Sequence, residues 1–393
     1  MSNATLPISS IQIPSLYDLT LEQLTQQLTA WGEPAFRAKQ IWRWLYQRFA
    51  QDLDEMSDLG KPLRARLREH FVLKRITPVL QQKSTDGWTR KWLLKFLDGS
   101  EIETVLMEYD SGSGKTERRT ACISSQAGCA MNCSFCATGQ MGFLRNLRAG
   151  EIIEQVVWVA RTLLEIGDSR LGQRQSPISN LQSPNLQSER LSNLVLMGMG
   201  EPFANYSNVM EAVRRLMQPE AEGGFGLGAR KITISTVGLV PGIRKFADED
   251  TQVNLAVSLH AATDELRNQL VPINVKYPLR DVIKATHDYI KKTNRRVSYE
   301  WALIDGVNDT VEQANALVDV VDKTFPMDER HLVHVNMIPL NPTQGYRGHA
   351  SIQERREKFR YILDQAGVPN TMRVRRGIDI AAGCGQLKAE ASQ

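Results

Sequence analysis

Cysteine, long apolar runs and net charge are all scarce in this sequence of 393 residues. Five cysteines are too few, and odd in number, for a secreted scaffold held together by disulfides. No run of about 18 consecutive apolar residues occurs, which excludes an ordinary transmembrane helix. The 48 Lys and Arg and 44 Asp and Glu leave a formal charge of only +4, which by itself names neither a nucleic acid nor a membrane as partner.

The N-terminus, MSNATLPISSIQIPSLYDLT, lacks the basic segment and following apolar stretch of a secretory signal. This absence predicts a protein of the reducing cytoplasm, with no membrane partner. In that compartment, clustered cysteines more often bind metal or perform chemistry than form disulfides. Four of the five cysteines fall between Cys122 and Cys136, so this region is the first candidate site.

The composition, 42% apolar and 23% charged, is typical of a soluble globular protein. At roughly 150 residues per domain, the length predicts two to three domains. The first, residues 1–78, is predicted to be a small helical domain, because Thr20 and Gln23 have capping-box spacing and apolar residues follow at helical intervals. Residues 34–75 hold ten Lys and Arg against five Asp and Glu. This basic segment is either an accessory RNA-binding surface or a solvated helix face, and both interpretations stay open.

Residues 79–115 have a strand-like pattern, with Asp86-Gly87 and Asp98-Gly99 as hairpin turn signals. From 116 to 393, short apolar runs alternate with helix-like stretches; the runs are TACISS, LVLMGMG, KITIST, NLAVSLHA, VSYEWALI and HLVHVNMIPL. This α/β alternation predicts a parallel sheet covered by helices. Six such units predict a partial (βα)6 barrel, with its chemistry on loops at the C-terminal ends of the strands. The polar residues 167–192 interrupt the pattern and are predicted to form a mobile loop without assigned function.

The pattern C-x3-C-x2-C places Cys129, Cys133 and Cys136 directly after the strand-like TACISS. Three thiolates this close can bind one inorganic centre and leave one coordination position open. A structural zinc site would need a fourth ligand and usually a second cysteine pair. The one other cysteine nearby is Cys122, seven residues upstream, so zinc is the weaker interpretation.

With an aromatic residue before its last cysteine, the motif resembles that of the radical S-adenosylmethionine (SAM) superfamily. The stretches SSQAGCAMNCSFCATGQMGF, LMGMGEP, ITISTVG, AVSLHA, NMIPLNP and RRGIDIAAGCGQL resemble the adenine-C2 RNA methyltransferases that modify 23S rRNA and tRNA. The likeness extends over essentially the whole chain apart from residues 167–192. It implies that Cys129, Cys133 and Cys136 bind a 4Fe-4S cluster whose open iron is chelated by SAM. It also implies 23S rRNA and tRNA as partners, and a reducing electron donor such as flavodoxin or ferredoxin.

Methylation at C2 of adenine needs a radical, because this carbon is not nucleophilic and cannot attack the methyl group of SAM. The resemblance implies two SAM molecules per turnover. The first methylates the thiolate of Cys384, and the second, reduced at the cluster, yields a 5′-deoxyadenosyl radical that removes hydrogen from the S-methyl group. The resulting methylene radical adds to C2 and links protein and RNA covalently.

Release of this adduct requires a base and a second thiol. Glu103 alternates along a strand-like stretch with Val105 and Met107, which is compatible with a partly desolvated carboxylate whose pKa is raised into the working range of a base. From the residues alone, a solvent-exposed strand glutamate is the default interpretation. The resemblance makes Glu103 the proton acceptor. It makes Cys122 the thiol that attacks Cys384 and frees the product through a transient disulfide. From its strand alone, a small buried apolar residue is the better interpretation of Cys122.

The same resemblance extends to residues that bind SAM and RNA. In MGMGEP, Gly198 and Gly200 are expected to admit the ligand, and Glu201 to accept a hydrogen bond from its α-ammonium. Further SAM contacts are expected from Ser235, Ser258, Leu259, His260 and Asn341, with a core imidazole as the alternative for His260. Candidate ligands of RNA phosphates are Arg145, Arg148, Arg373, Arg375 and Arg376, around a pocket that receives the extruded base. Two alternatives to the whole assignment stay open: methylation at adenine C8 by the same residues, and a non-enzymatic zinc RNA-binding protein.

Overall fold

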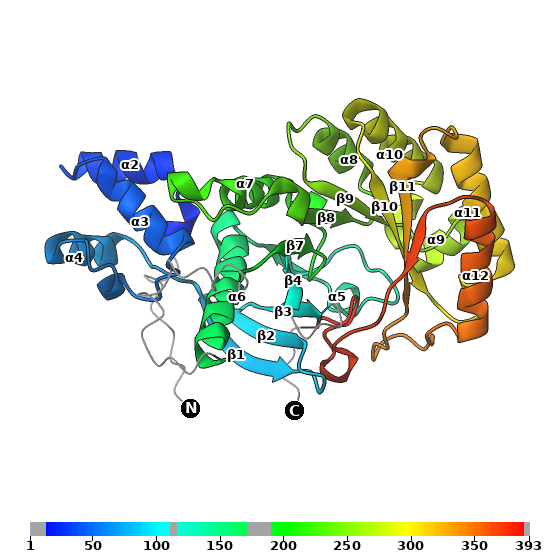
Figure 1. Ribbon diagram of the computed structural model, residues 1–393, viewed down its shortest axis with the longest axis horizontal. Coiled ribbons are helices and arrows are strands. Elements are labelled where there is room, and N and C mark those ends of the chain that lie inside the picture. Colours follow the sequence, from blue (N-terminus) through cyan, green and yellow to red (C-terminus); the bar gives the residue numbers. More distant parts are fainter. Residues whose placement is uncertain (1–12, 111–115, 171–189, 389–393) are drawn as a thin grey trace.

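The computed structural model describes residues 13–110, 116–170 and 190–388 of the chain. Three helices, α2 (Leu21–Ala30), α3 (Phe36–Tyr46) and α4 (Lys61–His70), lie together at one end of the molecule (Figure 1). The predicted capping box starts α2: Gln23 N donates to Thr20 Oγ1 at 3.1 Å, and Thr20 N donates to Gln23 Oε1 at 2.9 Å. Buried aromatic residues of α3, including Trp42 and Trp44, join this unit to the main core.

The rest of the molecule is built on one ten-stranded sheet, in the order β1-β2-β3-β4-β7-β8-β9-β10-β11-β12. Its strands are β1 (Ile76–Lys83), β2 (Thr89–Phe96), β3 (Glu101–Asp110), β4 (Thr116–Cys122), β7 (Asn193–Leu196), β8 (Ile232–Thr236), β9 (Asn254–Ser258), β10 (Val297–Leu303), β11 (Val333–Pro339) and β12 (Asn370–Met372). Pairing is antiparallel from β1 to β4 and parallel from β4 to β12. Within the described residues β1 and β12 do not pair with each other, so the barrel is incomplete.

Six parallel strands therefore match the six predicted apolar runs, and β12 adds one short parallel strand at the edge. The connecting helices are α6 (Ala149–Arg170), α7 (Tyr206–Met217), α8 (Val240–Ala247), α9 (Asp264–Leu270), α10 (Leu279–Thr293), α11 (Val311–Thr324) and α12 (Gln353–Gln365). In Figure 1, α8, α10, α11 and α12 lie along the outside of strands β8 to β11. Both predicted hairpin turns are present: Gly87 lies between β1 and β2, Gly99 lies between β2 and β3, and each has a positive φ angle.

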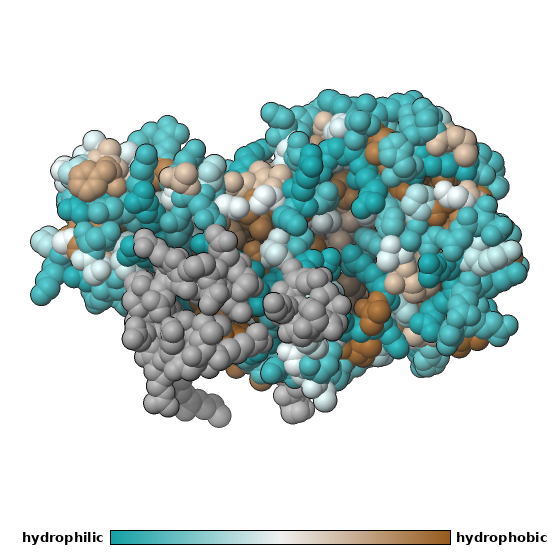
Figure 2. Space-filling model, in the orientation of Figure 1, coloured by the Kyte–Doolittle hydropathy of each residue, from teal (hydrophilic) through white to brown (hydrophobic). Residues whose placement is uncertain are grey.

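Helix α6 continues to Arg170, so the first residues of the predicted loop 167–192 are helical, and residues 171–189 lie outside the described part of the chain. Every helix in the described ranges is too short or too polar to span a bilayer. The face shown in Figure 2 is largely hydrophilic, and its hydrophobic residues are seen mainly in recesses.

A buried carboxylate on α6 joins the helical unit to the sheet. Glu154 is 2% exposed, and its Oε2 accepts hydrogen bonds from Arg75 N at 2.6 Å and Ile76 N at 3.2 Å. Ser15 Oγ lies 3.3 Å from the other oxygen. Burial raises the pKa of Glu154 to about 8, although these backbone donors oppose the shift.

This raised pKa predicts a pH-dependent stability. Between the ordinary pKa of 4.5 and about 8, folded Glu154 holds a proton that the unfolded chain has lost, so the free energy of unfolding falls as pH rises through this window. Glu154→Gln keeps an acceptor for both amides and removes the titration. We expect denaturant unfolding at several pH values to show a flatter pH dependence for this variant than for the wild type. Glu165→Gln, exposed on the same helix, is the control, and a pH dependence unchanged in Glu154→Gln would refute the assignment.

Candidate active site

The three cysteines of the motif lie on a loop closed by a small two-stranded sheet. Strand β5 (Gln126–Gly128) precedes the loop, and α5 (Ala137–Gln140) and β6 (Phe143–Asn146) follow it. Cys129 N donates to Gly142 O at 2.8 Å, and Cys136 N donates to Cys133 O at 3.1 Å. Because these hydrogen bonds and the pairing of β5 with β6 fix the loop, the three thiols are held at defined positions relative to one another.

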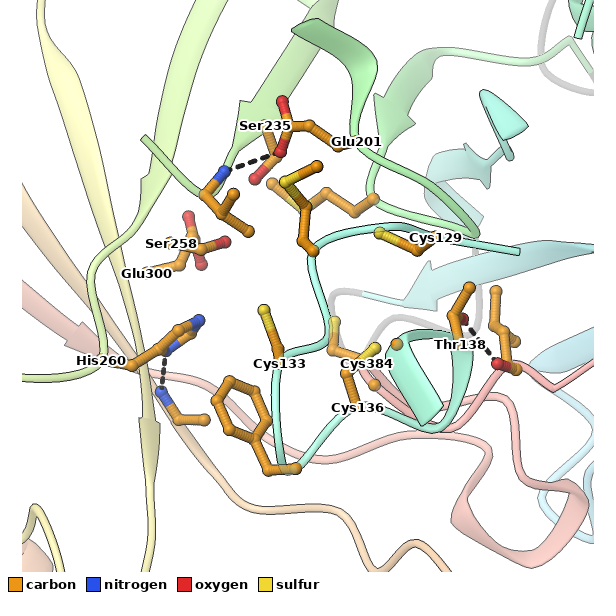
Figure 3. Close-up of a pocket in the computed structure, with 18 of the residues that line it drawn as sticks. Cys129, Cys133, Cys136, Thr138, Glu201, Ser235, Ser258, His260, Glu300 and Cys384 are labelled. Atoms are coloured by element: carbon orange, nitrogen blue, oxygen red, sulfur yellow. Dashed lines mark hydrogen bonds between the residues drawn. The ribbon is translucent and has the colours of Figure 1, made fainter. Parts of the chain in front are cut away.

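These thiols line one cavity, here called the cluster cavity, at the C-terminal ends of the parallel strands (Figure 3). Predicted site residues that also line it are Gly198, Gly200, Glu201, Ser235, Ser258, His260, Asn341 and Cys384. Figure 3 shows Cys133 and Cys129 directed towards the open centre. Leu259 is fully buried and is not a lining residue; its backbone N donates to Glu300 O at 3.0 Å. Glu103 and Cys122 do not line this cavity.

The thiols have the chemistry that an iron-sulfur cluster requires. Burial, with additional repulsion from neighbouring thiols, raises the pKa of Cys129 to about 12 and that of Cys133 well above its ordinary value. A bound metal reverses this preference, because a coordinated thiol is deprotonated. Among the described residues, no three His, Cys, Asp or Glu side chains converge on one ion position. A four-iron cluster does not need such convergence, because each cysteine binds a different iron, so the donor set fits the cluster.

Glu201 follows β7 and lies between two strand ends. It is 2% exposed, Oε1 accepts from Phe203 N at 2.9 Å, and Oε2 accepts from Val237 N at 2.8 Å. Burial raises its pKa to about 7 against these donors. The preceding Gly200 has a φ of +99°, and an added Cβ would lie 2.5 Å from Gln126 Cβ. Close approach to the chain after β4 therefore requires a glycine here, at a position that also lines the cluster cavity.

His260 follows β9 with a φ of +59°, an uncommon value for a residue other than glycine. Its Nδ1 accepts a hydrogen bond from Ala302 N at 3.0 Å, so the neutral ring carries its proton on Nε2. Burial, with Arg267 nearby, lowers its pKa to about 3. The imidazole is therefore a neutral group that lines the cavity, with its Nδ1 already hydrogen-bonded to the backbone.

Cys384 stands on a C-terminal segment, residues 381–388, that packs against the cysteine loop. Ala137 N donates to Gly385 O at 2.8 Å, and Asn341 Nδ2 donates to Cys384 O at 3.1 Å. The Oδ1 atom of Asn341 is buried and has no hydrogen-bond partner among the described residues, so a free acceptor is available beside the cavity. Cys384 is accessible to solvent, yet it lies in a recess where the surrounding protein raises the pKa of its thiol.

Cys384 also lines a second cavity, here called the cationic cavity, together with Cys122. Four arginines line this cavity, and none of the lining residues in the described part of the chain is acidic; the arginines are Arg118, Arg373, Arg375 and Arg376. The guanidinium groups of Arg118 and Arg376 lie 4.0 Å and 4.9 Å from the ring centroid of Tyr109. Burial, and then the nearby Cys384, raises the pKa of the Cys122 thiol. All five cysteines are free, so the transient disulfide implied by the resemblance is not formed in this structure.

Glu103 on β3 is more deeply buried than its alternation in sequence predicts. It is 3% exposed and pairs with Lys91, whose Nζ lies 2.8 Å from Oε1, while Lys388 N donates to Oε2 at 2.9 Å. It lines neither the cluster cavity nor the cationic cavity.

Two of the predicted RNA-contacting arginines, Arg145 and Arg148, lie away from the cationic cavity, and the other three line it. Arg145 makes ion pairs with Glu151 at 2.8 Å and with Asp98, so its charge is used within the fold, contrary to the expectation of a free phosphate ligand. Arg148 is half-exposed, 3.8 Å from Asp18. The other three predicted arginines line the cationic cavity.

Two residues at or beside the site, Glu300 and Arg267, were not predicted from the sequence. Glu300, inside β10, lines the cluster cavity and accepts from Asn336 Nδ2 at 3.0 Å, and burial raises its pKa. Arg267 is fully buried and donates to the carbonyls of Val237, Ser258 and Leu259, which fixes the ends of β8 and β9. A strand carboxylate and a helix arginine carry no local pattern that distinguishes them from surface residues. That Glu300 and Arg267 are buried charged residues is seen only in the folded chain.

Comparison with known proteins agrees with this geometry. Residues 15–73 match the family model described as the ribosomal RNA large subunit methyltransferase N-terminal domain. The chain is 48% identical over 373 residues to a "Probable dual-specificity RNA methyltransferase RlmN" of Chloroflexus aurantiacus, covering 95% of this chain and 92% of the relative. It is 45% identical over 375 residues to the "Dual-specificity RNA methyltransferase RlmN 1" of Myxococcus xanthus, covering 95% and 94%. The crystal structure of a radical SAM methyltransferase from Sphaerobacter thermophilus superposes with a TM-score of 0.85 at 46% identity, covering 96% of this chain and all of that one.

Proposed function

Because the chain belongs to the RlmN family of dual-specificity RNA methyltransferases, which are radical SAM enzymes, we propose that it methylates C2 of adenine in two RNAs. The substrates are an adenine at the peptidyl-transferase centre of 23S rRNA and the adenine 3′ of the tRNA anticodon. One observation carries the proposal: Cys384 lines both the cluster cavity and the cationic cavity. A single thiol can therefore meet SAM on one side and RNA on the other.

The cluster cavity is the proposed cofactor site. Cys129, Cys133 and Cys136 would hold the 4Fe-4S cluster, and the acceptors Glu201 and Asn341 would bind the donor groups of SAM. When bound, the cluster and two SAM molecules per turnover supply a methyl group and a 5′-deoxyadenosyl radical. Ser235, Ser258, the backbone at Leu259 and His260 would complete the SAM contacts. A flavodoxin or ferredoxin is the proposed electron donor, and the cytoplasm the proposed location.

Three side chains of the protein perform the remaining steps. The Cys384 thiolate accepts the methyl group and carries its carbon to C2 of adenine. Glu103 accepts the proton that C2 loses. Cys122, in the same cavity as Cys384, loses its thiol proton and attacks the Cys384 sulfur; the bond from that sulfur to carbon breaks, a disulfide forms, and the freed methylene carbon takes up a proton to become the methyl group of the released base. The one electron left over from the radical would return to the cluster. An external thiol must then reduce the disulfide.

The cationic cavity is the proposed entry for the target nucleotide. Four arginines, with no carboxylate among the described lining residues, favour phosphate, and two of their guanidinium groups lie over the ring of Tyr109. An extruded adenine on this side would reach Cys384 directly. We assign residues 1–78 as an accessory RNA-binding domain, 79–115 as a hairpin extension, and 116–393 as the catalytic core. The non-enzymatic zinc protein is not supported by the relatives, which are named as methyltransferases.

Anaerobic reconstitution tests the proposed function. Purified protein is given iron, sulfide, SAM, a reductant, and either 23S rRNA fragments or tRNA, and the digested nucleosides are identified by mass spectrometry. We expect 2-methyladenosine from both RNAs. Formation of 8-methyladenosine would instead assign the alternative reaction, and an absence of any methyladenosine from a protein that holds its cluster would refute the proposal.

A further inference from the structure

The buried ion pair between Lys91 and Glu103 contacts the Cys384 segment on both sides of the cysteine. Lys91 Nζ lies 2.8 Å from Glu103 Oε1 and also donates to Ala381 O at 3.3 Å. The other oxygen, Glu103 Oε2, accepts from Lys388 N at 2.9 Å. Residues 381 and 388 lie on either side of Cys384 in the sequence, so a single pair from the β2–β3 hairpin contacts the segment both before and after the cysteine.

The hairpin gives this pair a rigid base. Strands β2 and β3 pair antiparallel with Leu93 opposite Glu103 and Lys91 opposite Val105, so Lys91 and Glu103 are diagonal neighbours on one face. Their side chains are 9% and 3% exposed. A buried charge that loses its partner is strongly unfavourable, so the two side chains are constrained to stay together.

These contacts also restrict Glu103 itself. Both carboxylate oxygens are engaged, one by an ammonium and one by a backbone amide of the Cys384 segment, and the carboxylate lines neither cavity. Glu103 can therefore receive a proton from RNA only when the segment moves. The carboxylate of Glu103 contacts the Lys91 ammonium and the Lys388 amide. Lys388 belongs to the moving segment and Lys91 does not, so Lys91 can hold the carboxylate in place during that movement.

We propose that Lys91 is a positioning residue that couples the proton acceptor Glu103 to the Cys384 segment. The inference rests on the proposed function, because it assigns Lys91 to the proton-transfer step of that reaction. Lys91 exchanges no proton: the proton passes from C2 of the adduct to the Glu103 carboxylate, while the Lys91 ammonium fixes the direction of that carboxylate. Without Lys91, the adduct forms but its proton is removed slowly.

The test compares Lys91→Met, Lys91→Arg and the control Lys95→Met. Lys95 pairs with Glu101 at 3.2 Å on the same two strands, but its side chain is 50% exposed, and within the described residues Glu101 is its one ion-pair partner. The reconstituted holoenzyme is mixed with RNA, and the ratio of covalent protein–RNA adduct to released methyladenosine is followed with time. This ratio reports only on enzyme that has reacted, so partial unfolding of a variant does not change it.

We expect Lys91→Met and Glu103→Gln each to raise the ratio at least tenfold, with Lys91→Arg between them and the wild type and Lys95→Met unchanged. A wild-type ratio in Lys91→Met would overturn the proposal, as would equal losses of Cys384 methylation, adduct and product. If Lys91→Met yields no folded enzyme, Lys91→Arg decides: a ratio raised several-fold supports the coupling, and an unchanged ratio refutes it. Failure of the proposed function is distinguishable, because the wild type would then form neither methylated Cys384 nor methyladenosine.

Discussion

Cys384→Ala is expected to form no covalent protein–RNA adduct and to lose methylation of RNA by about a thousandfold or more, because the methyl carrier is gone. Cys122→Ala is expected to fail at the last step, the release of the methylated RNA from Cys384. It retains Cys384 and forms the adduct, but it lacks the thiol that lines the same cavity and frees the product. The adduct should therefore accumulate to near stoichiometric amounts.

Gel electrophoresis under denaturing conditions measures the adduct, and mass spectrometry of the peptide containing Cys384 measures its methylation. The two variants control each other, because both remove one sulfur from the cationic cavity. Equal turnover by Cys122→Ala and the wild type would remove the role of Cys122. An adduct formed by Cys384→Ala would show that another residue carries the methyl group.

Cys133→Ala is expected to remove the iron-sulfur cluster. A cluster left with two of its three cysteine ligands is poorly held, so protein purified without oxygen should change from brown to colourless and should form no 5′-deoxyadenosine. The fold should be retained, because removing one buried sulfur leaves only a small cavity on a loop outside the main core.

Iron and sulfide analysis and the visible absorption spectrum measure this outcome. Cys122→Ala is the matched control: it also removes a buried thiol, yet it should keep a wild-type content of iron and sulfide. A colourless wild-type protein with one stoichiometric zinc would contradict the cluster assignment.

The repeating parts of the fold were predictable because they depend on local patterns. Each of the six predicted parallel strands is a short apolar run with a helix-like stretch after it, and this order allows few arrangements other than a parallel sheet with outer helices. The hairpin turns at Gly87 and Gly99 follow from a dipeptide that readily adopts positive φ. The end of α6 was misplaced, because the polar residues up to Arg170 extend a helix whose apolar face has already ended.

The positions of individual charges were less predictable. Arg145 has the appearance of a free basic residue in sequence, but Asp98 from a distant hairpin and Glu151 from the next helix bind it. Glu103 was expected to be a partly desolvated carboxylate and is instead 3% exposed and paired with Lys91. Such pairings depend on which segments pack together, and local periodicity does not contain that information.

The sequence by itself determined the six strand-helix units, the three-cysteine motif and the family, because each is written in residues close together or in stretches that can be compared directly. Only the tertiary structure decided that Cys384 lies where two cavities meet, that Arg118 and Tyr109 belong to one of them, and that Lys91 holds Glu103. The physical reason is that cavities and buried ion pairs arise between elements far apart in the chain. Their geometry exists only after the sheet has assembled and the C-terminal segment has packed against it.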